Sequence, residues 1–166
     1  MAFVENTQIV SAFAPVDMSA AANDGDWFNC ANYQRVVVLF VKGAGTAGDD
    51  PTLTITQASD NSGTGEKALT FTDIWYKQDT SLAATATFTH TTQTAASSYT
   101  DATSAEDQAI WVLEFSTDEL DVAGGFTHIQ ASVGDVGTNA QLGCAIYIGL
   151  DARYGAPSGS AQSAID

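Results

Sequence analysis

The chain has 166 residues, with 5 Lys and Arg against 20 Asp and Glu, so its formal net charge is −15. Hydrophobic residues make up 45% of the chain and charged residues only 15%, which indicates one packed domain with an acidic but charge-sparse surface, not a disordered chain. The five basic residues are spread from Arg35 to Arg153 and form no cluster. This distribution argues against binding to nucleic acid or to anionic membranes.

The chain start and the cysteines restrict the class further. The N-terminal sequence has no basic and apolar signal-peptide pattern, and no apolar run is long enough for a transmembrane helix. Cys30 and Cys144 belong to no CxxC pair or cysteine–histidine cluster, so we expect no structural zinc site. Each is expected to act as a small buried hydrophobe, with one long-range disulfide as the alternative.

Short segments with a hydrophobic period of two recur along the chain, and none sustains the 3.6-residue period of a helix. Turn-forming stretches rich in Gly, Asp, Asn, Ser and Thr separate them. About eight such segments predict an all-β fold, a single-domain antiparallel β-sandwich of jelly-roll type with long loops and flexible termini. The predicted strands are residues 8–16, 36–41, 52–58, 67–76, 84–91, 110–115, 127–133 and 142–150.

Several of these segments have patterns that predict burial. Residues 36–41 are apolar on both faces, as expected for a central strand, whereas residues 52–58 alternate apolar residues with threonines suited to a solvent-facing side. In residues 142–150, the large aliphatic side chains share one face. Trp75 and Trp111 lie within strong strand patterns, and we predict both to be core residues.

Two regions lack a strand pattern. Residues 92–108 are predicted to form a long loop. Ser116 with Glu119 fits the capping-box spacing of a short helical turn, as does the pair Thr103 and Glu106.

We divide the chain into three parts. Residues 1–7 form an N-terminal arm, residues 8–154 the β-sandwich domain, and residues 155–166 a flexible C-terminal tail rich in Gly, Ser and Ala. The two ends either fray or become ordered on a neighbouring subunit.

The sequence holds no recognised catalytic pattern. His90 and His128 are expected at surface or edge positions, and neither an HExxH nor a GxSxG motif is present. Glu114 interrupts an otherwise apolar strand and is the best single candidate for acid–base chemistry, as in a small glycan hydrolase. An outward-facing or edge position for Glu114 is the favoured interpretation.

Two loops resemble ligand sites, but other interpretations are favoured. Residues 60–66 place oxygen-bearing side chains at alternate positions as a calcium loop does, yet they lack EF-hand spacing and indicate a polar hairpin. Residues 43–48 (GAGTAG) resemble a phosphate loop, but a phosphate loop must be followed by a helix, and here Asp49, Asp50 and Pro51 follow. Asp49 and Asp50 are themselves interpreted as turn residues and not as metal ligands. We therefore predict no catalytic residue, no cofactor and no metal site, and hence not an enzyme.

A family resemblance extends over roughly residues 3–155. The chain resembles small virion proteins of tailed bacteriophages, and in particular capsid cement (decoration) proteins of marine siphophages. The segments that carry this resemblance are residues 25–27 (GDW), 32–36 (NYQRV), 42–54 (KGAGTAGDDPTLT), 64–71 (TGEKALTF), 118–126 (DELDVAGGF) and 139–143 (NAQLG).

The resemblance implies a β-rich protein, often a trimer, that sits on the capsid exterior and bridges neighbouring major capsid proteins. It implies assembly in the host cytoplasm, and it brings no catalytic residues. The alternatives are another virion role, such as a tail or neck component or a carbohydrate-binding head fibre, and a small glycan hydrolase. Because the acids fall largely in predicted turns and loops, we expect contact surfaces on the uncharged sheet faces, the edges and the terminal arms.

Overall fold

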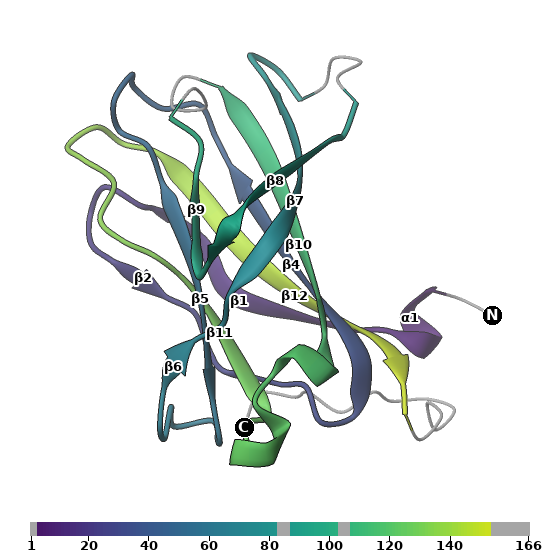
Figure 1. The fold of residues 1–166 in the computed structure, drawn as a ribbon. Helices are drawn as coiled ribbons and strands as arrows, with labels where there is room; N and C mark the ends of the chain where they lie inside the picture. Colours follow the sequence, from purple (N-terminus) through teal and green to yellow (C-terminus); the bar gives the residue numbers. More distant parts are fainter. Residues whose placement is uncertain (1–2, 83–86, 103–106, 154–166) are drawn as a thin grey trace.

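The computed structural model describes residues 3–82, 87–102 and 107–153. Nearly all regular structure in this part of the chain is β, in two antiparallel sheets that form a sandwich (Figure 1), which confirms the predicted fold class. The strands are β1 Gln8–Asp17, β2 Asn23–Asp24, β3 Phe28–Asn29, β4 Tyr33–Lys42, β5 Thr52–Ala58, β6 Lys67–Ala68, β7 Phe71–Asp79, β8 Thr89–Ala96, β9 Ser98–Thr100, β10 Gln108–Ser116, β11 His128–Val133 and β12 Leu142–Ala152. The helical turns are α1 Phe3–Asn6, η1 Thr117–Glu119 and η2 Val122–Gly124.

In the described part of the chain each sheet has six strands, but the strands of sheet B are shorter. Sheet A has the strand order β1-β12-β4-β10-β7-β8. Sheet B has the order β2-β11-β5-β6, with β3 paired to β11 and β9 paired to β5. The long strands β4, β10 and β12 lie in the middle of sheet A.

The strand pairing is that of a jelly roll with an insertion. β1 pairs with β12, β2 with β11, β4 with β10 and β5 with β9, so the first strand meets the last and the pairs nest inward. Strands β6, β7 and β8 are inserted between β5 and β9. Of these, β7 and β8 extend sheet A beyond β10.

Aromatic side chains fill the space between the sheets. Trp111 of β10 is fully buried and packs on Phe40 of β4 and on Tyr99 of β9, with ring centroids 5.1 and 4.9 Å apart. Tyr147 of β12 crosses to sheet B, where its hydroxyl donates to the Asp26 carbonyl (2.9 Å) and accepts from the Ala131 amide (2.8 Å). Burial raises the pKa of Tyr147, so this hydroxyl stays protonated as a donor.

Apart from Tyr147, the residues that β12 directs into the core are small. Its inward positions include Gly143 and Gly149, where an added Cβ would lie 2.5 Å from Met18 Sδ and 2.8 Å from the Tyr33 ring. The large aliphatic residues of β12 do share one face, as the sequence predicts, and that face points outward. Glycine is needed at positions 143 and 149 because Met18 and Tyr33 occupy the space there.

The prediction that Trp75 belongs to the core is wrong, whereas Trp111 is buried as predicted. The segment predicted as one strand over residues 67–76 consists of β6 and β7. A register shift between Phe71 and Asp73 then changes the alternation along β7. As a result Ile74 is buried and Trp75 is 47% exposed on the outer face.

The predicted loop over residues 92–108 is also wrong. β8 continues to Ala96, and β9 follows at once and pairs with β5 in the other sheet. The Gln93 side-chain amide donates to the carbonyls of Phe71 and Ser98, which stabilises this crossing between sheets. No residue of β8 is buried, so the strand has no hydrophobic pattern in the sequence. Of the strand predicted over residues 84–91, only 89–91 are in β8, and residues 84–86 lie outside the described residues.

The remaining local predictions have mixed outcomes. Residues 3–6 of the predicted N-terminal arm form the single turn α1, and Thr7 Oγ1 donates to the Phe3 carbonyl at its end. Ser116 caps η1 as predicted, and Glu119 accepts a hydrogen bond from the Ser116 backbone in return.

The second predicted capping pair, at positions 103 and 106, and the predicted tail at 155–166 lie outside the described residues. No helix in the described ranges is long and apolar enough to span a membrane.

Candidate functional site

The outer face of sheet A carries a continuous set of apolar side chains, which we call the apolar face. Along β4, the inward residues Val36, Val38 and Phe40 are buried against sheet B, and the residues between them point outward. None of the described helices or strands is stacked on this outer side (Figure 1). The apolar face comprises Ile9, Val37, Leu39, Val41, Trp75, Ile110, Val112, Leu142, Cys144, Ile146, Ile148 and Leu150.

Strand register aligns most of these residues in three rows across the sheet. Residues directly opposite each other on adjacent strands are close enough for their side chains to touch. The rows therefore form one surface that spans β1, β12, β4, β10 and β7. They are Cys144–Val41–Ile110–Lys77, Ile146–Leu39–Val112–Trp75 and Ile9–Ile148–Val37–Glu114.

The apolar face is open to solvent at both ends. Ile9 is 47% and Leu142 63% exposed, and most of the residues between them are half-buried by their neighbours within the sheet. Beside β12, α1 adds two exposed apolar side chains, Phe3 and Val4. A contiguous exposed apolar surface of this kind is typical of protein–protein interaction sites.

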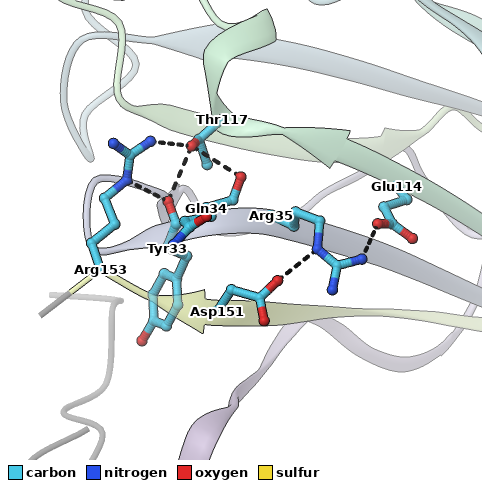
Figure 2. Close-up of polar contacts among 7 residues, drawn as sticks. All are labelled: Tyr33, Gln34, Arg35, Glu114, Thr117, Asp151 and Arg153. Atoms are coloured by element: carbon cyan, nitrogen blue, oxygen red, sulfur yellow. Dashed lines mark hydrogen bonds and ion pairs between the residues drawn. The ribbon is translucent and has the colours of Figure 1, made fainter. Parts of the chain in front are cut away.

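A charged cluster borders one end of the apolar face (Figure 2). Arg35 of β4 donates from Nη1 to Glu114 Oε1 of β10 (2.6 Å) and from Nε to Asp151 Oδ2 of β12 (2.7 Å). These hydrogen bonds, first that to Asp151 and then that to Glu114, raise the pKa of Arg35. All three side chains are about half-exposed, so the cluster orients Arg35 across three strands and adds little stability.

A second arginine connects the end of β12 to the start of β4 (Figure 2). Arg153 donates from Nε to the Tyr33 carbonyl (2.9 Å) and from Nη2 to Thr117 Oγ1 (2.6 Å). The Thr117 hydroxyl in turn donates toward the carbonyls of Tyr33 and Gln34. Together the two arginines border an open hollow of about 530 Å³, which is lined by Gln34, Arg35, Ser116, Asp118, Asp151 and Arg153.

This charged cluster was missed by sequence reasoning. Arg35 and Asp151 are 116 positions apart, and no motif connects them. The pairing of β4 with β12 brings them together, so only knowledge of strand order could have predicted their contact. Both arginines are already bound to groups of this chain, and the cluster forms a polar border to the apolar face.

Glu114, the sequence candidate for acid–base chemistry, is outward-facing as the favoured interpretation predicts. Its carboxylate is occupied by Arg35. A glycoside hydrolase needs a second carboxylate placed across the scissile bond and an acid that can give up a proton. The geometry assigns Glu114 to orienting Arg35.

The two histidines have different surroundings. His90 is exposed, its Nε2 lies 2.8 Å from Asp73 Oδ1, and its ring stacks on Trp75 with centroids 4.6 Å apart. The expectation of a surface or edge position is wrong for His128, which is buried because β11 lies between β3 and β5 at that point. Its Nδ1 is bonded to Thr127 Oγ1 (2.9 Å), and burial lowers its pKa.

The loops that resemble ligand sites are closed by their own hydrogen bonds. Asp60 Oδ1 accepts from the amides of Ser62 and Thr64, and hydrogen bonds from Thr64 lower the Asp60 pKa, so this segment is the predicted polar hairpin. No helix follows residues 43–48; the chain turns there and enters β5. In the described ranges, no group of three or more His, Cys, Asp or Glu side chains is arranged to hold a metal ion.

The cysteines are free, which excludes the alternative of a disulfide between them in this structure. Cys30 is buried in the core, as expected for a small hydrophobe, and burial raises its pKa strongly. Cys144 is half-buried and belongs to the apolar face.

Comparison with known proteins gives little further information. No protein-family model matches this sequence, and no curated protein matches it. Among solved structures, the chain is similar to the SPBc2 prophage-derived protein YomS, with a TM-score of 0.45 and 11% sequence identity over 86% of this chain and 93% of that chain. The fold and the apolar face are therefore the basis for a functional proposal.

Proposed function

We propose that this protein is a structural component of a bacteriophage virion. It binds the exterior of the capsid, bridges neighbouring major capsid proteins and so stabilises the head as a cement or decoration protein. In this proposal it is not an enzyme, it assembles in the host cytoplasm, and it acts at the capsid surface as a homo-oligomer, a trimer. The resemblance of the sequence to phage cement proteins supports the capsid role.

The observation that carries the proposal is the apolar face. A sandwich that functions alone in water gains nothing from rows of Val, Leu and Ile on an outer side, because those side chains contribute little to its core. Such a surface is useful to a protein that is covered when it works. An acidic chain with few charges also stays soluble before assembly and has few charges to desolvate on association.

One observation favours a second candidate, a carbohydrate-binding head fibre. Trp75 is 47% exposed and lies beside His90 and Asp73, a combination of aromatic surface and polar groups that sugars use in stacking and hydrogen bonding. If this candidate is correct, wild-type protein binds glycans in an array and Trp75→Ala loses that binding. An absence of glycan binding by the wild-type protein removes it.

The proposal is tested on particles of the phage that encodes this chain. We expect particles without the protein to lose DNA at lower temperature and after milder osmotic shock than complete particles. We also expect a copy number near that of the lattice positions in the shell. Equal resistance of both kinds of particle would contradict the cement role, and a few copies per particle would indicate a tail or neck component.

A further inference from the structure

We propose that the apolar face is covered by a second copy of this chain. The inference rests on the proposed self-association and names a surface used for it, and it does not depend on binding to the capsid. Two identical faces packed on each other form a two-fold dimer, so this contact is separate from the contacts that would hold the proposed trimer together. Three properties of the apolar face support it: its size, its shape and its charge.

The size fits a protein–protein interface. With strands ~4.8 Å apart and rows ~6.8 Å apart along the strands, three rows of four residues cover roughly 400 Å². A standard stable interface buries roughly 800 Å² on each partner. The three rows therefore have the size of the apolar centre of such an interface, and the polar residues around them would form its rim.

The shape fits another surface of the same kind. The middle row, in which Ile146, Leu39 and Val112 are side by side, consists of side chains of similar height on a regular sheet. Two sheet faces of this type pack against each other about 10 Å apart, as sheets A and B do inside the sandwich.

The charge favours a copy over a basic partner. Within the three rows the charged residues are Lys77 and Glu114, which sum to zero, although the whole chain carries −15. A basic partner would bind to an acidic surface, whereas the charges within the three rows of the apolar face sum to zero. On the apolar face another strongly acidic chain meets no excess of like charge.

The experiment measures the mass of the purified full chain by sedimentation equilibrium, for the wild type and for matched lysine variants. Leu39→Lys places a charge in the middle row of the apolar face. Thr54→Lys places the same charge on the outer face of sheet B, where Thr54 pairs with Ser98 and Ser132. Circular dichroism and thermal melting check that both variants fold. If Leu39→Lys does not fold, Ile146→Thr replaces it as a milder substitution in the same row.

We expect the wild type to sediment as a dimer of the 17.3 kDa chain, or as a hexamer where the proposed trimer also forms. Leu39→Lys should raise the dissociation constant roughly 30-fold or more, as for the loss of an interface hot spot, and Thr54→Lys should leave it unchanged. Added salt should strengthen the wild-type association, because it screens the repulsion between two chains of charge −15. A basic partner would show the opposite dependence on salt.

Two results would overturn the inference: a wild-type monomer at all concentrations, or equal effects of the two lysine variants. Either result leaves the capsid role standing if particles still lose resistance without the protein, and the apolar face is then a capsid-binding surface. Conversely, self-association through the apolar face with no effect on particle resistance would remove the capsid role alone.

Discussion

The outer faces of the two sheets differ although the sheets share one core. On sheet B, the outward residues of β5 and β11 are Thr52, Thr54, Thr56, Gln130 and Ser132, which are all polar. On sheet A, the matching positions of β4, β10 and β12 are mostly aliphatic. In both sheets, alternate residues of each strand face inward and form the core. The residues between them face outward, and their composition reflects the surroundings of that face. The outer face of sheet B has the composition of a water-exposed surface, and that of sheet A has the composition of a covered one.

The largest expected difference in stability between a core substitution and a surface substitution is that between the two tryptophans, Trp111 and Trp75. Trp111→Ala empties a buried site between Phe40 and Tyr99 and should lower the free energy of unfolding by about 3–5 kcal/mol. Trp75→Ala removes a half-exposed ring on the apolar face and should cost less than about 1.5 kcal/mol. Urea unfolding of both variants below the concentration of self-association measures the difference, and equal losses would contradict the placement of Trp75.

A smaller loss is expected from Tyr147→Phe, which keeps the packing but removes the hydroxyl that connects the sheets. The Asp26 carbonyl and the Ala131 amide then lose a partner inside the sandwich. We expect a loss of about 1–3 kcal/mol in urea unfolding, the cost of unsatisfied buried groups. A loss below about 0.5 kcal/mol would show that water or another group reaches this site.

Removal of Arg35 should have little effect on folding. Arg35→Gln breaks ion pairs with Glu114 and Asp151 whose members are all about half-exposed, so we expect a change of less than about 1 kcal/mol. The change should shrink further in high salt. A loss above about 2 kcal/mol would show that the charged cluster is structural and not a border to a binding face.

The smallest effect is a pH dependence that arises from His128. Its folded-state pKa is lowered below the ordinary value of 6.5, so the unfolded chain binds the proton more readily. The contribution of His128 to stability is therefore complete above pH 6.5 and is lost as the pH falls toward the folded-state pKa. Melting temperatures between pH 8 and 5.5 should decline for the wild type and for His90→Asn, and the decline should be flatter for His128→Asn. The same slope in His128→Asn as in the wild type would exclude His128 as its source.

Strand patterns could be predicted wherever a strand has a buried face. The predicted segments at 36–41, 52–58, 110–115 and 142–150 all lie within observed strands, because hydrophobic alternation is a direct consequence of burial. β8 has no buried residue and therefore no such pattern. The sequence of β8 is rich in threonine, and threonine alone does not distinguish a strand from a loop.

The direction of side chains was harder to predict than the strands themselves. A single register shift between Phe71 and Asp73 reversed the prediction for Trp75. In β4, side chains apolar on both faces predicted a central strand, which is correct, but did not show that one face lacks a covering layer. Contacts between distant residues, such as Arg35 with Asp151, depend on strand order and could not be found by spacing.

The most direct test of the apolar face uses its own cysteine. Cys144 lies beside Val41 in the first row and is half-buried, whereas Cys30 is buried in the core and serves as an internal control. The rate of Cys144 alkylation is followed by mass spectrometry across concentrations that bracket the dissociation of the oligomer. If a second copy covers the apolar face, the rate falls as the protein associates and stays high in Leu39→Lys. A rate that is the same for monomer and oligomer would contradict the account.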